Sequence, residues 1–221
     1  MATRQDATIS PRLVTALDRA WAAIQARHPD VPAVVIALGS GSGNRTRLKF
    51  GHFAPERWQR DDGRLPELFI GGEGLARGSR DVLGTLLHEA AHGVASTRKI
   101  QDTSRQGRFH NSRFRALAEE IGITVTKDPS IGWSITAVPD VTAALYRAEL
   151  RRLDEALVAW RHAEGDGRGG RKNNNNGVAA RCGCDRRIRV AESVLEAGPI
   201  TCGLCGTDFE AAAADNSLAE A

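Results

Sequence analysis

Residues 83–94, LGTLLHEAAHGV, set two histidines four positions apart in a segment that is otherwise small and apolar. Side chains four positions apart lie on the same face of an α-helix, one turn above each other. A helix over 79–96, with Ser79 as its N-cap, therefore turns His88 and His92 to one side. The polar stripe holds Asp81, Thr85, His88 and His92, and the apolar side holds Leu83, Leu86, Leu87, Ala90 and Val94. Such a helix is buried on one face only, so the chain must build a core against it and leave the stripe open.

Two imidazoles on one helical stripe are typical of a metal site, and a neighbouring carboxylate adds catalytic chemistry. Glu89 follows His88 directly and lies about 100° around the helix from it. It can accept a proton from a water on the metal without binding the metal itself. The pattern predicts a zinc-dependent hydrolase in which His88 and His92 hold Zn²⁺ and Glu89 is the general base.

A catalytic zinc usually takes three protein ligands and keeps a fourth position open, so this helix lacks one ligand. A metzincin would place a third histidine at position 98, which is Arg98 here. A gluzincin would use an acidic residue such as Glu119 or Glu120, but these lie in a predicted helix whose other residues have structural roles. His110 follows His92 by 18 residues and stands at the start of that helix. We expect His110 to be the third ligand.

The remaining pattern predicts an α+β domain over residues 1–163. Further helices are expected at 10–28, which Ser10 and Pro11 begin, at 111–121 and at 140–161. Strands are expected at 34–38, 45–50, 67–71, 123–126 and 133–138. The apolar side of the last helix is expected to carry Leu145, Leu150, Leu153, Leu157 and Trp160.

The chain changes character after residue 163. Residues 164–178 contain the run GDGRGGRKNNNNG, which has no apolar side chain and predicts a flexible linker. Residues 179–210 hold two close cysteine pairs, with strands expected at 188–190 and near Ile200. The tail, 211–221, is expected to be disordered.

Four thiolates without an open position predict a structural zinc site. The proposed ligands are Cys182, Cys184, Cys202 and Cys205, with 17 residues between the two pairs. A redox pair and free thiols are the alternatives. The module is too small to fold on an apolar core alone, so metal binding would supply its stability.

The net charge of +3 and the pI near 8.9 permit contact with nucleic acid without requiring it. Within 98–115 the only acidic residue is Asp102, and basic residues dominate. The candidate nucleic-acid contacts in this segment are Arg98, Lys99, Arg105, Arg108 and Arg113. A solvated loop with scattered charges is the competing interpretation. No apolar run begins the chain or approaches the roughly 18 residues of a membrane span, so we expect a cytoplasmic protein, associated with the nucleoid if it binds DNA.

Four segments together resemble the SprT-like (Spartan-type) metalloprotease family: LFI at 68–70, TLLHEAAH at 85–92, GRFHNSRF at 107–114 and LAEEIG at 117–122. The resemblance covers roughly residues 10–163 and is strongest over 68–122. It implies a small zincin-like domain, with helices on a short mixed sheet and an extended substrate paired with residues 67–71. It assigns the catalytic zinc to His88, His92 and His110, the catalytic role to Glu89, and a following aromatic position to Phe114.

The resemblance also implies protein substrates that are bound or crosslinked to DNA, and a C-terminal zinc ribbon. The leading hypothesis is therefore a zinc-dependent endopeptidase with one catalytic and one structural Zn²⁺ per chain. The alternative is a nucleic-acid-binding zinc protein with little or no proteolytic turnover. A three-histidine RNase is a third hypothesis, which Glu89 disfavours because such an enzyme needs no glutamate beside its first histidine.

Overall fold

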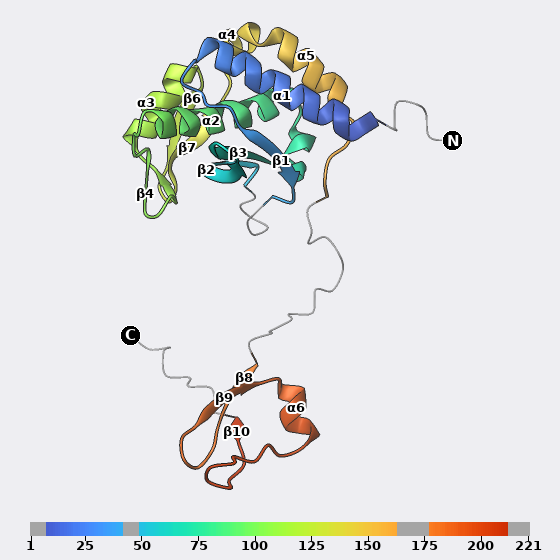
Figure 1. Ribbon diagram of the computed structural model, residues 1–221, viewed down its shortest axis with the longest axis vertical. Helices are drawn as coiled ribbons and strands as arrows, with labels where there is room; N and C mark the ends of the chain where they lie inside the picture. The colour runs from blue at the N-terminus through green and yellow to red at the C-terminus, as the bar shows by residue number, and fades with distance from the viewer. Residues whose placement is uncertain (1–7, 42–48, 163–176, 212–221) are drawn as a thin grey trace, which may run out of the picture. The chain divides into compact units, whose positions relative to one another are not determined.

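The computed structural model describes residues 8–41, 49–162 and 177–211 (Figure 1). The chain divides into two compact units, residues 1–164 and 165–221, each with a hydrophobic cluster of its own. Helices and strands mix in the first unit, which agrees with the α+β prediction.

A three-stranded mixed sheet in the first unit has the order β1-β3-β2. β3 lies in the middle, parallel to β1 and antiparallel to β2; the strands are β1 (Val35–Gly39), β2 (Gly51–Arg60) and β3 (Gly63–Gly71). The expected strand at 34–38 is confirmed, and the one at 67–71 is the end of a longer strand. Most of the strand expected at 45–50 lies outside the described residues.

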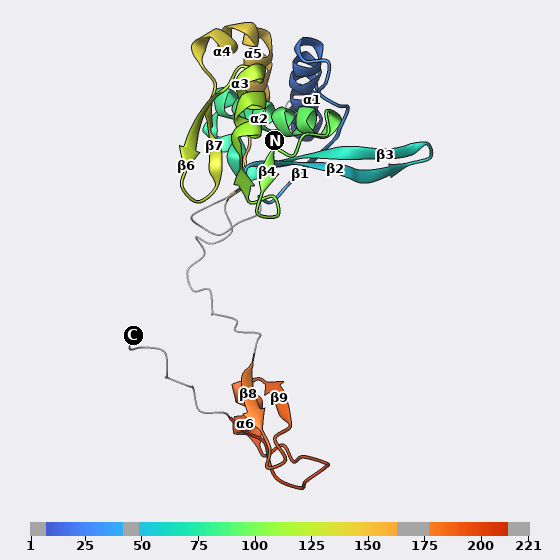
Figure 2. The ribbon, with the colours of Figure 1, turned by 90° about the vertical axis from the view of Figure 1, so that its left-hand side faces the viewer.

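The central position of β3 corrects the expectation that a substrate pairs with residues 67–71. β1 pairs with all five of these residues on one side, and β2 pairs with 67–70 on the other. The sequence did not predict β2, because Pro55 and the polar residues after it break the alternation expected of a strand. The far end of the β2–β3 hairpin projects from the unit as an exposed arm (Figure 2).

Helices α1 (Ile9–Arg27) and α2 (Ser79–Thr97) confirm the predictions over 10–28 and 79–96. Their starts differ in detail, because the N-caps are Thr8 and Gly78 and neither supplies a side-chain capping hydrogen bond. Ser79 is therefore the first helical residue and not the cap. The expected apolar face of α2 is buried throughout; its members are Leu83, Leu86, Leu87, Ala90 and Val94.

A second sheet, of four strands, has the order β4-β5-β7-β6. Its strands are β4 (Thr103–Ser104), β5 (Phe109–His110), β6 (Thr124–Asp128) and β7 (Gly132–Ala137). Helix α3 (Ser112–Ile121) connects β5 to β6, and Asn111 caps it. The predicted helix and the two long strands are confirmed, whereas β4 and β5 fall in a segment expected to be a loop. Two residues are too few to establish a strand periodicity.

The predicted helix over 140–161 is wrong in its continuity and in its last five residues. Two helices occur instead, α4 (Asp140–Leu145) and α5 (Arg147–Ala156). Leu153 is buried as expected, but Leu145 and Trp160 are 58% and 57% exposed. Apolar residues keep their helical spacing across the break, which is why the sequence alone predicted one helix.

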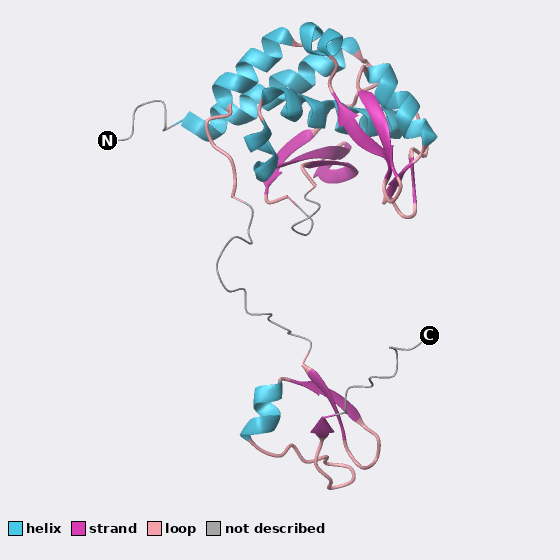
Figure 3. Ribbon diagram, turned by 180° about the vertical axis from the view of Figure 1, so that it is seen from behind, coloured by secondary structure: helices cyan, strands magenta, loops and turns pink. Residues whose placement is uncertain are grey.

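Helix α2 is the centre of the first unit. It contacts α1, α3 and α5, strands β2 and β7, and the short 3-10 helix η2 (Gly72–Arg77) that precedes it. From behind, the helices gather on one side of the unit and the strands on the other (Figure 3). The polar stripe of α2 touches both sheets, because Thr85 lies against Gly51 of β2 and His88 lies near Thr136 of β7.

The second unit is small and is built around a three-stranded sheet of order β10-β8-β9. Its elements are β8 (Val178–Arg181), β9 (Arg187–Val190), α6 (Glu192–Ala197) and β10 (Glu210–Ala211). The strand at 188–190 is confirmed, but an isolated bridge between Thr201 and Asp208 replaces the one expected near Ile200. The predicted linker up to 176 and the tail from 212 lie outside the described residues. No helix in the described ranges is both long and apolar enough to cross a membrane.

We predict that Leu86→Ala lowers the free energy of unfolding of the first unit by about 2–5 kcal/mol, because it leaves a cavity under α2. Leu145→Ala is the matched control and should change it by less than about 0.5 kcal/mol, since that side chain is exposed. All four tryptophans lie in the first unit, so urea unfolding followed by tryptophan fluorescence reports on it. Equal effects of the two changes would contradict the packing of both helices.

Candidate metal centres

Three histidines from two distant segments meet above the polar stripe of α2. His88 and His92 come from the helix and His110 from β5, and their ligand atoms all lie within 4.8 Å of one another. The ring centres are 5.1–5.2 Å apart in all three pairs. The Nε2 atoms of His92 and His110 are only 3.2 Å apart. The three residues predicted from sequence are thus brought together in a set that could hold one metal ion.

Phe114 forms the floor under these rings. Its ring centre is 4.7 Å from His88, 4.7 Å from His92 and 4.5 Å from His110, and the side chain is fully buried. Asn111 begins α3 by accepting hydrogen bonds from the backbone of Arg113 and Phe114. The cap of α3 therefore fixes the helical turn that carries this aromatic support.

A β-hairpin, and not the start of a helix, delivers His110. The backbone N–H of His110 donates to the Ile131 carbonyl at 2.9 Å, and His110 pairs with Gly132 of β7. Gly132 has a φ of 79°, and a Cβ added there would overlap the His110 carbonyl oxygen. Only glycine allows β7 to approach β5 this closely, so Gly132 sets the position of the third imidazole.

Each imidazole has a partner at Nδ1, on the side away from the shared centre. His92 Nδ1 donates to Asp102 Oδ2 at 2.6 Å, a direction that follows because an ionised carboxylate only accepts. His110 Nδ1 is 3.3 Å from the Ile131 carbonyl oxygen, and His88 Nδ1 is 3.5 Å from Thr136 Oγ1. Protonation at Nδ1 leaves the Nε2 lone pairs free, as a metal site requires.

The pKa values of the three imidazoles diverge. Burial and the neighbouring histidines lower the pKa of His88 well below its usual value and that of His110 to about 4. Burial is the largest single influence on His92 and opposes its protonation, but the hydrogen bond to Asp102 and the negative charges of Glu89 and Asp102 together outweigh it and raise the pKa of His92. At neutral pH two of the rings are therefore neutral donors, and Asp102 is the group that compensates charge on the third.

Glu89 lies beside this set in a buried position, with 5% of its surface exposed. Burial raises the pKa of its carboxyl, and the charge of His92 and a hydrogen bond from the Phe53 backbone partly oppose that rise. A Cβ at Gly51 would come within 3.3 Å of Glu89 Cγ, so β2 crosses α2 directly at this residue. The sequence pointed to Glu89 as a candidate general base, but only the fold shows that the backbone of β2 packs against its side chain.

Asp102 is the site residue that the sequence analysis did not identify. It is the only acidic residue in the basic segment 98–115, and 9% of its surface is exposed. An isolated carboxylate among cations, ten residues after His92, was the available signal. Thr136 had no such signal, because its contact with His88 depends on how β7 packs against α2.

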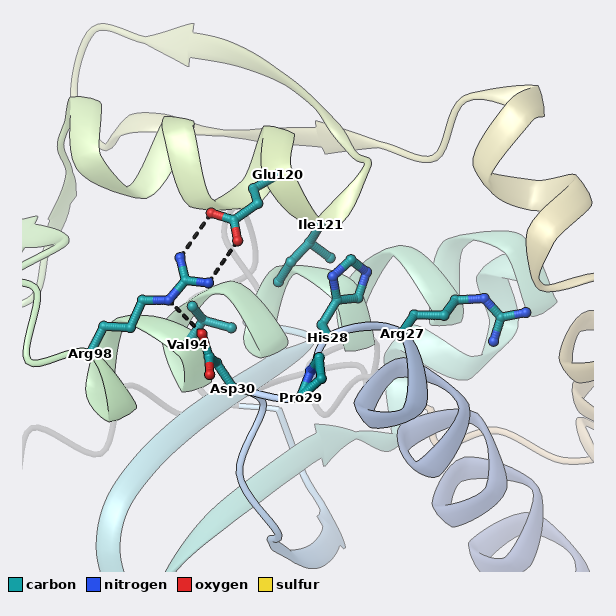
Figure 4. A pocket seen from close by; sticks show the side chains of 8 residues that line it. All are labelled: Arg27, His28, Pro29, Asp30, Val94, Arg98, Glu120 and Ile121. Atoms are coloured by element: carbon teal, nitrogen blue, oxygen red, sulfur yellow. Dashed lines mark hydrogen bonds and ion pairs between the residues drawn. The ribbon is translucent and has the colours of Figure 1, made fainter.

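The predicted nucleic-acid residues separate into two groups. Arg98 pairs with Glu120 through two hydrogen bonds, of 2.9 and 2.7 Å, and with Asp30 at 2.7 Å. These contacts line a hollow beside His28, at the C-terminal end of α2 (Figure 4). Arg98 is therefore a structural cation. The other four remain exposed on and beside the β4–β5 hairpin: Lys99, Arg105, Arg108 and Arg113.

The second unit brings its four cysteines together. The Sγ atoms of Cys182, Cys184, Cys202 and Cys205 all lie within 4.8 Å of one another, so they could hold a metal ion. The Cys182–Cys184 separation of 3.4 Å is far longer than the roughly 2.0 Å of a disulfide, so the redox-pair alternative has no bond here. Hydrogen bonds from Thr207 lower the pKa of Cys205 to about 6, which favours the thiolate form that metals bind.

Comparison with known proteins identifies no relative: no family model matches the chain, and neither curated proteins nor solved structures give a match. The chemistry of the two clusters is therefore argued from their residues alone.

We predict that Asp102→Asn lowers the zinc affinity of the histidine site by about 10- to 100-fold, because Asp102 fixes the tautomer of His92 and compensates its charge. Competition with a fluorescent zinc chelator measures the affinity. Asp30→Asn is the control, since Asp30 pairs with Arg98 away from the histidines. Unchanged affinity in Asp102→Asn would remove Asp102 from the site.

We also predict about two zinc ions per wild-type chain and about one in His110→Ala, because two imidazoles remain at the first centre and the four thiols are untouched. Mass spectrometry of metals in the purified protein measures the content. His28→Ala should keep both ions, as His28 lies in the hollow of Figure 4. Two ions in His110→Ala would show that His110 is not a ligand.

Proposed function

We propose that this chain is a zinc-dependent endopeptidase of the SprT-like type, whose substrates are proteins bound or crosslinked to DNA. The observation that carries the proposal is a buried carboxylate, Glu89, beside three imidazoles that converge within 4.8 Å. Structural zinc sites are closed by four ligands, whereas three histidines keep a position open for a reacting molecule. We propose a zincin-like fold for the first unit on the same grounds, namely helix α2 with its two histidines and His110 as the third.

The donor set suits zinc. Three imidazole Nε2 atoms, each with an acceptor or hydroxyl behind Nδ1, match the ligand type and orientation that zinc prefers. A zinc ion held by His88, His92 and His110 would polarise a carbonyl oxygen and lower the pKa of a water toward ~7.

Glu89 would act as the proton carrier. Burial raises the pKa of Glu89 toward neutral pH, which suits a group that must both take up and release a proton. Glu89 would accept a proton from the attacking water and return it to the leaving amine. The Phe53 backbone hydrogen bond holds the carboxylate while it is charged. Asp102 keeps His92 oriented throughout and takes no part in the proton transfer.

β2 is the strand that we propose to bind an extended substrate, in place of β3. Gly71 N–H donates to Phe50 O, and bonding alternates along an antiparallel pair. The backbone groups of Gly51 and Phe53 therefore face the outer side of the sheet, beside Glu89. A peptide paired with this edge would lie across the polar stripe of α2.

We also propose that the cysteine unit is a zinc ribbon. Its buried apolar residues are few, so an ion held by the four thiols would supply much of its folding free energy. An arginine contacts the cluster, with Arg186 Nη1 donating to Cys202 Sγ at 3.6 Å. This contact would offset part of the negative charge of four thiolates around a divalent ion.

A nucleic-acid-binding zinc protein with little turnover is the second candidate. The observation in its favour is the group of exposed cations around the hairpin that carries His110. Four such residues could neutralise several phosphates beside the site and would make binding salt-sensitive. The same surface serves the first proposal, because it would bring a DNA-bound protein to the site.

We predict that Glu89→Gln lowers proteolysis of a disordered protein substrate by about 10²- to 10⁴-fold while the zinc content stays unchanged. Rates are measured by gel with and without single-stranded DNA. Glu119→Gln is the control, because Glu119 pairs with Arg115 on α3. Undiminished cleavage in Glu89→Gln would overturn the mechanism, and DNA binding without any wild-type cleavage would favour the second candidate.

A further inference from the structure

Arg77, the last residue of η2, points a cation at the polar stripe of α2 and contacts only neutral acceptors. Its Nη2 donates to Thr85 Oγ1 at 2.8 Å and to the Asp81 carbonyl oxygen at 3.4 Å, and its Nε donates to the Gly74 carbonyl oxygen at 3.3 Å. The guanidinium carbon lies 4.0 Å from the centre of the Phe50 ring. The group is thus oriented by four neighbours.

The charge of Arg77 is left without a carboxylate in ion-pair contact among the described residues. The other arginines at the ends of α2 differ in this respect. Arg80 pairs with Asp140 at 2.7 Å, and Arg98 pairs with Glu120 and Asp30. Arg77 also remains exposed to solvent, so an anion can reach it. The carboxylate of Asp81 acts on this charge electrostatically but makes no direct contact with it. A guanidinium that is oriented by its neighbours, accessible and without an ion-pair partner among the described residues can donate to a carboxylate through Nη1, because Nε and Nη2 already donate within the protein.

Thr85 links Arg77 to the catalytic carboxylate. It precedes His88 by three residues, which is about 4.5 Å along the helix axis. A Cβ at Gly51 would come within 2.7 Å of Thr85 Cγ2 and 3.3 Å of Glu89 Cγ, so the same point of β2 covers both residues. An extended peptide advances about 3.3 Å per residue, so a substrate on this edge would bring a side chain to Arg77 within about two residues of the reacting bond.

We infer that Arg77 forms a carboxylate-binding subsite of the cleft, which selects peptides that carry Asp or Glu within two residues of the scissile bond. The inference rests on the proposed peptidase function and adds the substrate class to it. Arg77 is a specificity residue: it binds the substrate side chain and takes no part in proton transfer.

The test compares cleavage of matched peptides that carry Glu or Gln at each position near the scissile bond, using the full zinc-loaded chain. We expect one position at which the wild type favours Glu over Gln by about 10- to 100-fold in kcat/KM, the effect of one charge-assisted hydrogen-bonded pair. Arg77→Gln should bring that ratio close to one, and Arg77→Lys should restore part of it. With Arg77→Glu the preference should invert, so that a matched peptide with Lys at this position is cleaved faster than the Glu peptide. Arg80→Gln, the control, should keep the wild-type ratio, because Arg80 is held by Asp140.

The outcomes separate the two proposals. Wild-type cleavage without a preference for Glu, or a preference that survives Arg77→Gln, overturns the subsite and leaves the peptidase proposal standing. No cleavage of any peptide or protein overturns the peptidase function and the subsite with it. If peptides show no preference and Arg77→Gln instead weakens binding of a single-stranded oligonucleotide, the cation serves phosphate and the inference is wrong. An inverted ratio in Arg77→Glu supports it, since a merely structural role would not reverse the sign.

Discussion

Helix α2 has one face buried in the core and one face that is partly exposed and polar, and the arrangement of the first unit depends on this division. Five apolar side chains on one face are buried, and the opposite stripe carries Thr85, His88 and His92 in partly exposed positions. Burying one face requires α1, α3 and α5 as covers. On the other side β2 crosses the helix only beside Thr85 and Glu89, and the three histidine side chains stay partly exposed. The hydrophobic effect thus determines where the polar chemistry is exposed.

The third imidazole is brought to that stripe by the backbone contacts of its strand. His110 sits on a two-residue strand bound to Ile131 and Gly132, and Asn111 then closes the hairpin against Asp102 and begins α3. The same few residues therefore position a ligand, the carboxylate behind another ligand, and the Phe114 floor.

The two metal centres differ in how closely the fold controls them. The histidine set is held by a unit with a large apolar core that does not include the histidines, so we expect this unit to fold without an ion. The cysteine set belongs to a unit whose buried cluster contains two of the four cysteines themselves. We therefore expect folding and metal binding to be coupled in that unit and separable in the first unit. This difference is what the proposal expects of a catalytic site in the first unit and a structural site in the second.

The sequence by itself determined the extent of α2, the stripe that carries His88 and His92, and the grouping of the cysteines. These depend on local periodicity and spacing, which can be read directly from the sequence. Tertiary structure alone decided that Asp102 lies behind His92, that β3 is central and β2 is the edge, and that Arg77 meets Thr85. It also broke the predicted helix at Tyr146 and left Leu145 and Trp160 exposed. Those outcomes depend on how different segments pack against one another, and no local pattern records the choice of partner.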